Sequence, residues 1–572
     1  MMCRRWHRRS SGSQRTVHTQ RRLWKRDCAT RSVSTGIRRE KNTERCCLMK
    51  FDILAVLYKK IPKHTKICLL TGLIAGWVTH FYMLTHKLVN WDDANNMSAY
   101  GSGDYLGRWF LKYIHPLGSE HSIPAVHGVL FILLVAVSAC LILEIVGIKS
   151  TTGAVLVPVA LMTFPSMAST MTFMFMAHTS GLGIFMVALA VYLLRRYRYG
   201  SIACGALLIC VLGTYQSYIS FAITLMLMGM IHDLINNDKT FREVFQEGIL
   251  CVIVLGVSVA LYMWLSHVIY PNLDNETYGG VGNMGQIAPA QMPVLIARCY
   301  KRFLEFFLWK PFAFMTGTKQ AANIAVCVLA VVLFITLVIK KKLYQDILKL
   351  VLLIVVCGFV PLAAAFVYFM APEVDYSMLM LYAYVLIDVL VLALLEYCLK
   401  EWGSALRVEK IKKYMCYLLA AATVAAVALS CYTDYLLTNK AYLRTDLASQ
   451  RVASYFNRVI AFAETTEGFE AGDALTILGE FYYKDNPCSV EIDVLDSEDL
   501  RSLDGVALEN GLITSGVRDN FIKIFVGYET ALLSDGEKKA IMETQDYQEM
   551  SVYPSEGSVK KIDGVWVVKL CE

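Results

Sequence analysis

The sequence predicts a mainly α-helical bundle of about eleven membrane-spanning helices, followed by a small α/β domain on the outer side of the membrane. Of the 572 residues, 56% are hydrophobic and 18% are charged, with a mean hydropathy of +0.46. The apolar residues form runs long enough to cross about 30 Å of hydrocarbon, and charge clusters separate these runs. From about Leu437 the chain turns polar and acidic, with 24 Asp/Glu against 13 Lys/Arg.

The first 48 residues differ from the rest of the chain. They carry 14 Lys/Arg against three acids and show no apolar periodicity, so they cannot bury enough surface to fold. The stretch "MKFDILAVLYKKIPKHTK" that begins at Met49 is typical of a short amphipathic helix and basic cluster before a span. We expect residues 1–48 to be disordered or to precede the true start at Met49, with a transit peptide as the alternative, and residues 49–436 to form the transmembrane part.

The apolar runs predict eleven spans. They are residues 67–84, 126–146, 153–170, 174–194, 202–215, 217–235, 249–269, 321–339, 350–369, 378–395 and 414–436. The fifth is shorter than a full crossing, and the third contains Pro158 and Pro165. We expect both of these spans to be bent, tilted or broken.

The Lys and Arg clusters predict the orientation, because cytoplasmic loops carry an excess of positive charge. Clusters precede the first span, follow the fourth and the eighth, and precede the eleventh: Lys59, Lys60, Lys63, Lys66, Arg195, Arg196, Arg198, Lys340, Lys341, Lys342, Lys410, Lys412 and Lys413. With eleven crossings all of them fall on one side, which is then cytoplasmic. The loop after the first span, the loop at 270–320 and residues 437–572 would face outward.

Within residues 437–572 the pattern predicts a separate α/β domain. Residues 443–464 have helical spacing, residues 474–483 and 520–528 are strand-like, and residues 559–570 form a hairpin with Asp563-Gly564 at its turn. Cys488 and Cys571 could form a disulfide in an exported domain, although the sequence sets no distance between them. The other cysteines lie mostly in apolar runs without CxxC spacing or nearby histidines, so neither a zinc site nor a dense disulfide framework is indicated.

The first outer loop, "LVNWDDANNMSAYGSGDYLGRWFLKYIHP", holds the strongest candidates for chemistry. A carboxylate of Asp92 or Asp93 beside low-dielectric protein is suited to accept a proton from a sugar hydroxyl. Arg108 is suited to bidentate phosphate binding, Gly107 permits close backbone approach, and Trp109 can anchor at the interface. The pattern leaves open which acid is the base, and a solvated loop or a helix cap remains the alternative.

The stretches "WDDANNMSAYGSGDYLGRW" after the first span and "GTYQSY" between short spans resemble the type II serotype-converting (Gtr) glucosyltransferase family of bacterial cell envelopes. The resemblance covers most of residues 65–436. It implies a GT-C type, polyprenyl-phosphate-sugar-dependent glycosyltransferase in the bacterial cytoplasmic membrane. Such an enzyme moves glucose from a polyprenyl-phosphate carrier to an envelope polysaccharide or glycolipid on the outer face, and the donor, the glycan acceptor and membrane lipids would be its partners.

The resemblance also implies roles for residues. The family's first-loop acids fall on Asp92 and Asp93, its Gly-Arg-Trp on residues 107–109, and its Tyr-Gln segment on Tyr215 and Gln216. Some GT-C enzymes carry a further acid in the second outer loop. Here that loop offers only His178, so a second catalytic carboxylate is in question. A histidine at such a position is more often a packed or interfacial side chain than a catalyst.

The stretch "QMPVLIARCYKRFLEFFLWKPF" alternates basic and aromatic residues at helical spacing and predicts a helix lying in the membrane surface. Its Arg298, Lys301 and Arg302 could hold the donor phosphate or simply contact anionic headgroups. No phosphate loop, dinucleotide fingerprint or metal-ligand cluster is present in the sequence, so no cofactor and no nucleic-acid partner are expected. The alternatives are a GT-C enzyme that moves mannose, an aminosugar or an oligosaccharide, and a lipid-linked-sugar flippase, which would need charged residues within spans and internal repeats.

Overall fold

The computed structural model describes residues 53–97, 103–236, 238–273, 287–372, 377–405, 410–479, 500, 502–506 and 509–571. Residues 1–48, the start proposed at Met49, and Cys488 of the possible disulfide lie outside these ranges. The chain divides into two compact units, residues 1–66 and residues 67–572. The described part of the first unit holds α2 (Ile53–Lys60) and the first residues of α3 (Lys63–Thr85).

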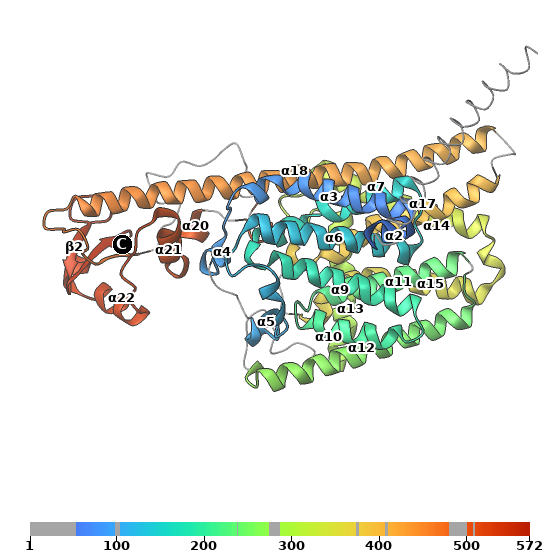
Figure 1. Cartoon of the computed structure of the whole chain (residues 1–572), viewed down its shortest axis with the longest axis horizontal. Coiled ribbons are helices and arrows are strands. Elements are labelled where there is room, and N and C mark those ends of the chain that lie inside the picture. The colour runs from blue at the N-terminus through green and yellow to red at the C-terminus, as the bar shows by residue number, and fades with distance from the viewer. Residues whose placement is uncertain are drawn as a thin grey trace, which may run out of the picture. The chain divides into compact units, whose positions relative to one another are not determined.

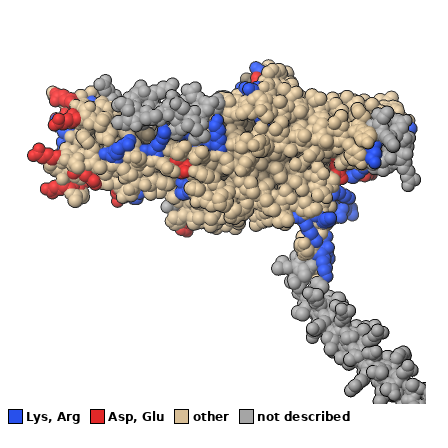
Figure 2. Space-filling model, turned by 90° about the horizontal axis from the view of Figure 1, so that it is seen from above, with Lys and Arg blue, Asp and Glu red and all other residues tan. Residues whose placement is uncertain are grey.

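Nine helices of the described residues are long and apolar enough to cross a membrane, so the chain is a multi-pass membrane protein. They are α3, α6 (Pro124–Val146), α9 (Ala177–Arg196), α11 (Tyr218–Asn236), α12 (Phe241–Ile269), α14 (Gly317–Lys340), α15 (Ile347–Ala364), α17 (Val385–Ala405) and α18 (Lys410–Glu464). On the face seen in Figure 2, charged side chains are sparse over these helices, and acidic side chains gather on the C-terminal segment.

The third and fifth expected spans depart from the others, as their sequences indicate. The third consists of α7 (Thr151–Thr163) and α8 (Pro165–Thr172), which meet at an angle of 47°. Pro165 begins α8 because a proline has no N–H to continue the preceding helix. The fifth, α10 (Gly200–Leu212), has only 13 residues. Counting the bent pair as one span gives ten, so the total of eleven remains a prediction that depends on α10.

Side-chain contacts join the helix ends that carry the Lys/Arg clusters. Arg195 at the end of α9 pairs with Asp233 of α11 at 2.8 Å and with Glu247 of α12 at 3.1 Å. Glu396 of α17 accepts hydrogen bonds from the backbone N–H groups of Lys149 and Ser150, just before α7. Lys341, just after α14, pairs with Glu401 of α17 at 3.3 Å. These ends meet at one end of the bundle, which we call the basic end, and the loop between α3 and α6 lies at the other (Figure 1).

Short elements occupy the end of the bundle opposite the basic end. They are α4 (Trp91–Asn95), η1 (Asp104–Leu106), α5 (Leu111–Ile114), η2 (His115–Leu117), η3 (Met174–Met176), η6 (Pro289–Gln291), α13 (Met292–Leu308), α16 (Val367–Met370), η8 (Met378–Met380) and η9 (Tyr382–Tyr384). The expected helix in the long loop is α13, which buries Leu295, Cys299, Phe303, Phe306 and Phe307 along one side. Between α14 and α15, η7 (Leu343–Gln345) turns the chain at the basic end.

The helix of the last span continues well beyond its apolar part. Helix α18 runs for 55 residues without a break, so residue 437, where a domain boundary was expected, falls inside a continuous helix (Figure 1). The expected helix at 443–464 is the last part of α18. Beyond it lie β1 (Leu475–Leu478), α20 (Glu509–Ile513), α21 (Ser515–Phe521), the π-helix η12 (Ile522–Val526), α22 (Asp535–Met542), α23 (Gln545–Gln548), β2 (Val559–Ile562) and β3 (Val565–Lys569).

The strands form one sheet in the order β1-β3-β2, with β1 parallel and β2 antiparallel to β3. The hairpin is confirmed: Asp563 and Gly564 both have positive φ, at 51° and 84°, as the turn between β2 and β3 requires. The strand expected at 520–528 is wrong, because residues 515–526 form α21 and η12. Phe521 and Ile522 are fully buried beside one another in sequence, and the apolar run that resembled a strand is the buried side of a helix.

Candidate active site

A cavity of about 720 Å³ opens at the end of the bundle opposite the basic end. It is lined by the loop between α3 and α6, by the corner between α8 and α9, by the start of α11, by η8, and by a stretch from beyond the last span. The lining residues are Trp91, Asp92, Asn96, Gly103, Tyr105, Leu106, Arg108, Leu111, Thr170, Phe173, Phe175, Met176, Ser180, Tyr215, Tyr218, Ser377, Leu379, Met380, Leu503, Asp504, Gly505 and Val506.

The helix α4 presents Asp92 to this cavity. Asn90 caps it, accepting a hydrogen bond from the backbone N–H of Asp93 at 2.8 Å, and donates to the carbonyl of Thr172 at 3.1 Å. The cap fixes the helix against α8, and Asp92 is left half-buried on the cavity wall. Burial raises the pKa of Asp92, the Arg108 guanidinium lowers it, and the neighbouring Asp93 carboxylate raises it. The net direction is upward, which suits a group that accepts a proton.

Asp93 occupies a different environment from its neighbour. Its side chain has no exposure and pairs with the Lys87 ammonium. Its Oδ1 accepts hydrogen bonds from the Ser122 hydroxyl at 2.7 Å and from the Phe175 N–H at 2.9 Å. Asp93 therefore joins α4 to the segments before α6 and before α9, and it is absent from the cavity lining.

Arg108 lies on the cavity wall with its guanidinium carbon 4.9 Å from the ring centre of Tyr215. This cation–π contact orients the guanidinium without consuming its hydrogen-bond donors. No described residue accepts a hydrogen bond from the buried Arg108 Nε. The side chain thus places a positive charge on the cavity wall.

The loop that carries Arg108 is held from behind by Gln216, whose amide nitrogen donates to the Leu106 carbonyl at 2.6 Å and to the Tyr262 hydroxyl at 2.8 Å. Gly107 has φ +72°, and an added Cβ would lie 2.5 Å from that hydroxyl. The Trp109 ring packs on Gly213 between the loop and α10, and a Cβ added to Gly213 would lie 2.8 Å from that ring. Gln216 and Trp109 therefore stand behind the cavity wall and support it, whereas Tyr215 lines it.

The remaining expected site residues do not line this cavity. His178 is buried, with Nε2 hydrogen-bonded to the His115 carbonyl at 3.1 Å. On α13 the Arg298 guanidinium donates to the Pro372 carbonyl, and Lys301 and Arg302 both pair with Glu305. None of the three cations shares a wall with Asp92.

Sequence reasoning missed one acidic group of the cavity, Asp504. It lies 67 residues beyond the expected boundary at Leu437, in an acidic stretch with no periodic pattern. Burial raises its pKa, and hydrogen bonds from the Leu379 N–H and the Ser377 hydroxyl lower it. Only the Asp504-Gly505 pair, which marks a tight turn, could have drawn attention to this stretch.

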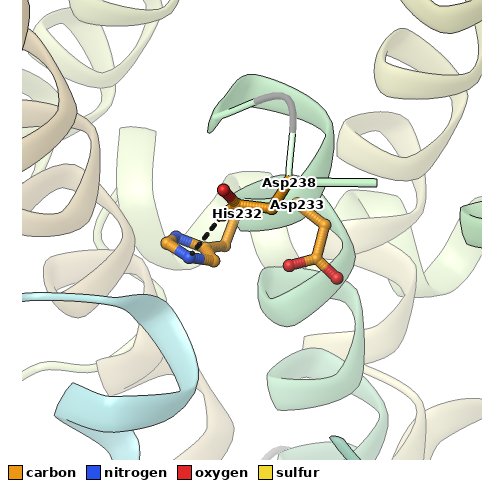
Figure 3. A group of neighbouring side chains, drawn as sticks. All are labelled: His232, Asp233 and Asp238. Atoms are coloured by element: carbon orange, nitrogen blue, oxygen red, sulfur yellow. Dashed lines mark ion pairs between the residues drawn. The ribbon is translucent and has the colours of Figure 1, made fainter. Parts of the chain in front are cut away.

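A second cluster of titratable groups lies at the basic end (Figure 3). The ligand atoms of His232, Asp233 and Asp238 lie within 4.8 Å of one another, a spacing that a metal ion would accept. However, the two carboxylate oxygens of Asp233 already pair with Arg195 at 2.8 Å and with Lys239 at 2.7 Å. Adjacent cations oppose the binding of a further cation, so we interpret this cluster as an ion-pair network that joins α9, α11 and α12.

Carboxylate, guanidinium and aromatic side chains around one cavity, at the end of a helical membrane bundle, are the groups that a membrane glycosyltransferase needs for proton transfer, phosphate binding and sugar stacking. The sequence comparison agrees and is more specific. The family model of the glucosyl transferase GtrII matches residues 81–395, more than half of the chain, and the protein belongs to this glucosyltransferase family. No curated protein and no solved structure matches the chain.

Proposed function

We propose that the protein transfers glucose from a polyprenyl-phosphate carrier to a cell-envelope glycan, in the cytoplasmic membrane of a bacterium and on its outer face. The observation that carries this proposal is that Asp92 and Arg108 share the wall of one cavity. A carboxylate with a raised pKa and a guanidinium on the same wall are the pair needed to activate a hydroxyl and to receive a phosphate. The membrane keeps a polyprenyl chain within reach of the cavity.

The orientation is part of the same proposal. The cavity lies opposite the basic end. Lys and Arg residues gather at that basic end, at the ends of α9 and α14. Positive loops remain in the cytoplasm, so the cavity would open outward. A lipid-linked donor carries its own activated bond, and an outward-facing site therefore needs no nucleotide.

In the proposed reaction an acceptor hydroxyl oxygen attacks the anomeric carbon of glucose, and the bond from that carbon to the phosphate oxygen breaks. Asp92 takes the hydroxyl proton as general base. The electron pair leaves on the phosphate oxygen, where Arg108 stabilises the charge. The products are the glycoside, with inverted configuration, and polyprenyl phosphate, and Asp92 later returns its proton to water.

Asp93 would act as a positioning residue in this reaction, because its contacts to Lys87, Ser122 and Phe175 hold α4. Tyr215 orients Arg108, and Gln216 supports the Arg108 loop. Arg298, Lys301 and Arg302 are not used.

The test is an assay of purified protein in proteoliposomes with polyprenyl-phosphate [¹⁴C]glucose. The acceptor is envelope glycan extracted from a strain lacking the gene, because this glycan lacks the added sugar. We expect label in the glycan and an equal amount of polyprenyl phosphate. A parallel reaction with polyprenyl-phosphate [¹⁴C]mannose tests the alternative donor. Label that crosses the bilayer while still on the lipid would indicate a flippase and would refute the proposed transfer.

A further inference from the structure

A short stretch from the C-terminal segment forms part of the cavity wall, although it lies beyond the last span and outside the residues that match the GtrII family model. Leu503, Asp504, Gly505 and Val506 all line the cavity that holds Asp92. We call residues 502–506 the inserted loop. No role in the family or in the proposed chemistry accounts for it so far.

The inserted loop is seated firmly in the bundle. Leu503 and Val506 are 1% and 5% exposed and belong to the same apolar core as the spanning helices. Gly505 has φ +79°, and an added Cβ would overlap the Thr172 hydroxyl at the end of α8. The backbone thus touches the bundle at a point where no side chain fits.

Asp504 joins two walls of the cavity. Its Oδ2 accepts hydrogen bonds from the Ser377 hydroxyl at 2.9 Å and from the Leu379 N–H at 2.8 Å. Ser377 and Leu379 line the cavity themselves, just before α17. The carboxylate therefore fixes the inserted loop to the segment that enters α17.

The C-terminal segment also holds α4 from the other side. Ala94 of α4 lies in one apolar core with residues of α18, α20, α21 and the sheet. The Asn520 amide donates to the Asn95 side-chain oxygen at 2.9 Å, and an added Cβ on Gly511 would lie 3.3 Å from the Trp91 ring. The segment after the last span thus contacts the cavity at α4 and at the inserted loop.

We propose that the inserted loop is the acceptor-binding wall of the cavity and that Asp504 is the residue that positions it. This inference rests on the proposed transfer from a lipid-linked donor. The donor's polyprenyl chain has to stay in hydrocarbon, so the donor enters from the membrane. The sugar part of the acceptor is polar and stays in water whether or not it is attached to a lipid, so it reaches the cavity from the side on which the polar, acidic C-terminal segment lies. A wall supplied by that segment therefore faces the acceptor.

Two variants test the inserted loop. Asp504→Ala removes the acceptor of two hydrogen bonds, and Gly505→Ala forces the loop away from Thr172. Gly516→Ala on α21 is the matched control, because nothing lies within 4 Å of its added Cβ. Each protein is assayed in proteoliposomes with polyprenyl-phosphate [¹⁴C]glucose, with glycan from the deletion strain or with water alone as acceptor. The measured quantities are the KM for glycan, the KM for donor and the rate of donor hydrolysis.

We expect both variants to raise the KM for glycan by about tenfold or more, the size of a lost hydrogen bond to a charged group, while donor KM and donor hydrolysis stay within about twofold. Asp504→Asn, which keeps an oxygen for the same donors, should recover most of this loss, and Gly516→Ala should match the unaltered protein. If Asp504→Ala does not fold, Ser377→Ala removes one donor to the same carboxylate and should give a smaller rise.

An unchanged glycan KM in these variants would overturn the inference. An equal change in donor KM and hydrolysis would also overturn it, because the loop would then serve the donor. A failure of the proposed function gives a different result, since the unaltered protein would then neither cleave the donor nor label the glycan.

Discussion

Replacement of each of the two adjacent acids of α4 by Asn should affect a different property: Asp92→Asn should lose transfer activity, and Asp93→Asn should lose stability. Asp92→Asn keeps the size of the side chain and removes the charge that accepts a proton. Loss of a general base typically costs about 10²- to 10⁴-fold in rate. Because Asp92 is half-buried and makes no ion pair among the described residues, the variant should fold normally and transfer no measurable glucose.

Asp93→Asn should instead reduce stability. The side chain has no exposure, and the new amide would place N–H donors or a neutral oxygen against the Lys87 ammonium. Removal of one partner of a buried pair costs about 3–5 kcal/mol. We expect a value near the lower end, about 3 kcal/mol, because the Lys87 side chain keeps 20% of its exposure. The amide oxygen can still accept from Ser122 or Phe175, which limits the loss further.

The assay combines thermal unfolding of detergent-purified protein with transfer rates per folded molecule. Asp93→Asn should unfold at a lower temperature and retain a larger share of its specific activity than Asp92→Asn. The double variant Lys87→Met, Asp93→Asn should recover part of the stability, because it leaves no unpaired charge. If Asp93→Asn proves stable but inactive while Asp92→Asn stays active, the assignment of the two carboxylates is reversed.

Three further outcomes follow from the cavity and the topology. The transfer rate should fall as the pH drops through the pKa of Asp92, at a pH above the ordinary aspartate value of 3.8. Arg108→Gln should move this fall to a higher pH, because it removes the charge that lowers the pKa of Asp92. A fall in rate only at or below pH 3.8 would contradict the role of Asp92 as general base. Gly107→Ala should abolish transfer because its Cβ would lie 2.5 Å from the Tyr262 hydroxyl. Gly256→Ala is the control and should transfer normally, because open space surrounds its added Cβ. Equal rates in the two variants would show that the loop carrying Arg108 can move without loss of activity. Reporter fusions at Lys341 and at the C-terminus should report opposite sides of the membrane, and identical readings would remove the proposed outward site.

The sequence predicted the spanning helices accurately where hydropathy alone determines their position. The bilayer requires each span to be a long apolar run, so α6 and α14 could be located from composition within a few residues. It failed at residues 520–528, where a short apolar run fits a strand and a buried helix equally well. The structure decides between them through packing, because Phe521 and Ile522 both enter the core that contains Ala94 of α4.

The sequence by itself determined that this is a multi-pass membrane protein, that its family is one of glucosyltransferases, and that the loop after the first span carries an acid pair and an arginine. These properties are local, since hydropathy and short motifs depend on neighbouring residues alone. Only the tertiary structure decided that Asp92 lines the cavity while Asp93 is buried, and that Asp504, about 400 positions further along the chain, lines the same cavity as Asp92. The reason is physical: burial and hydrogen-bond partners are set by segments distant in sequence, and two adjacent carboxylates become different groups only when those segments pack around them.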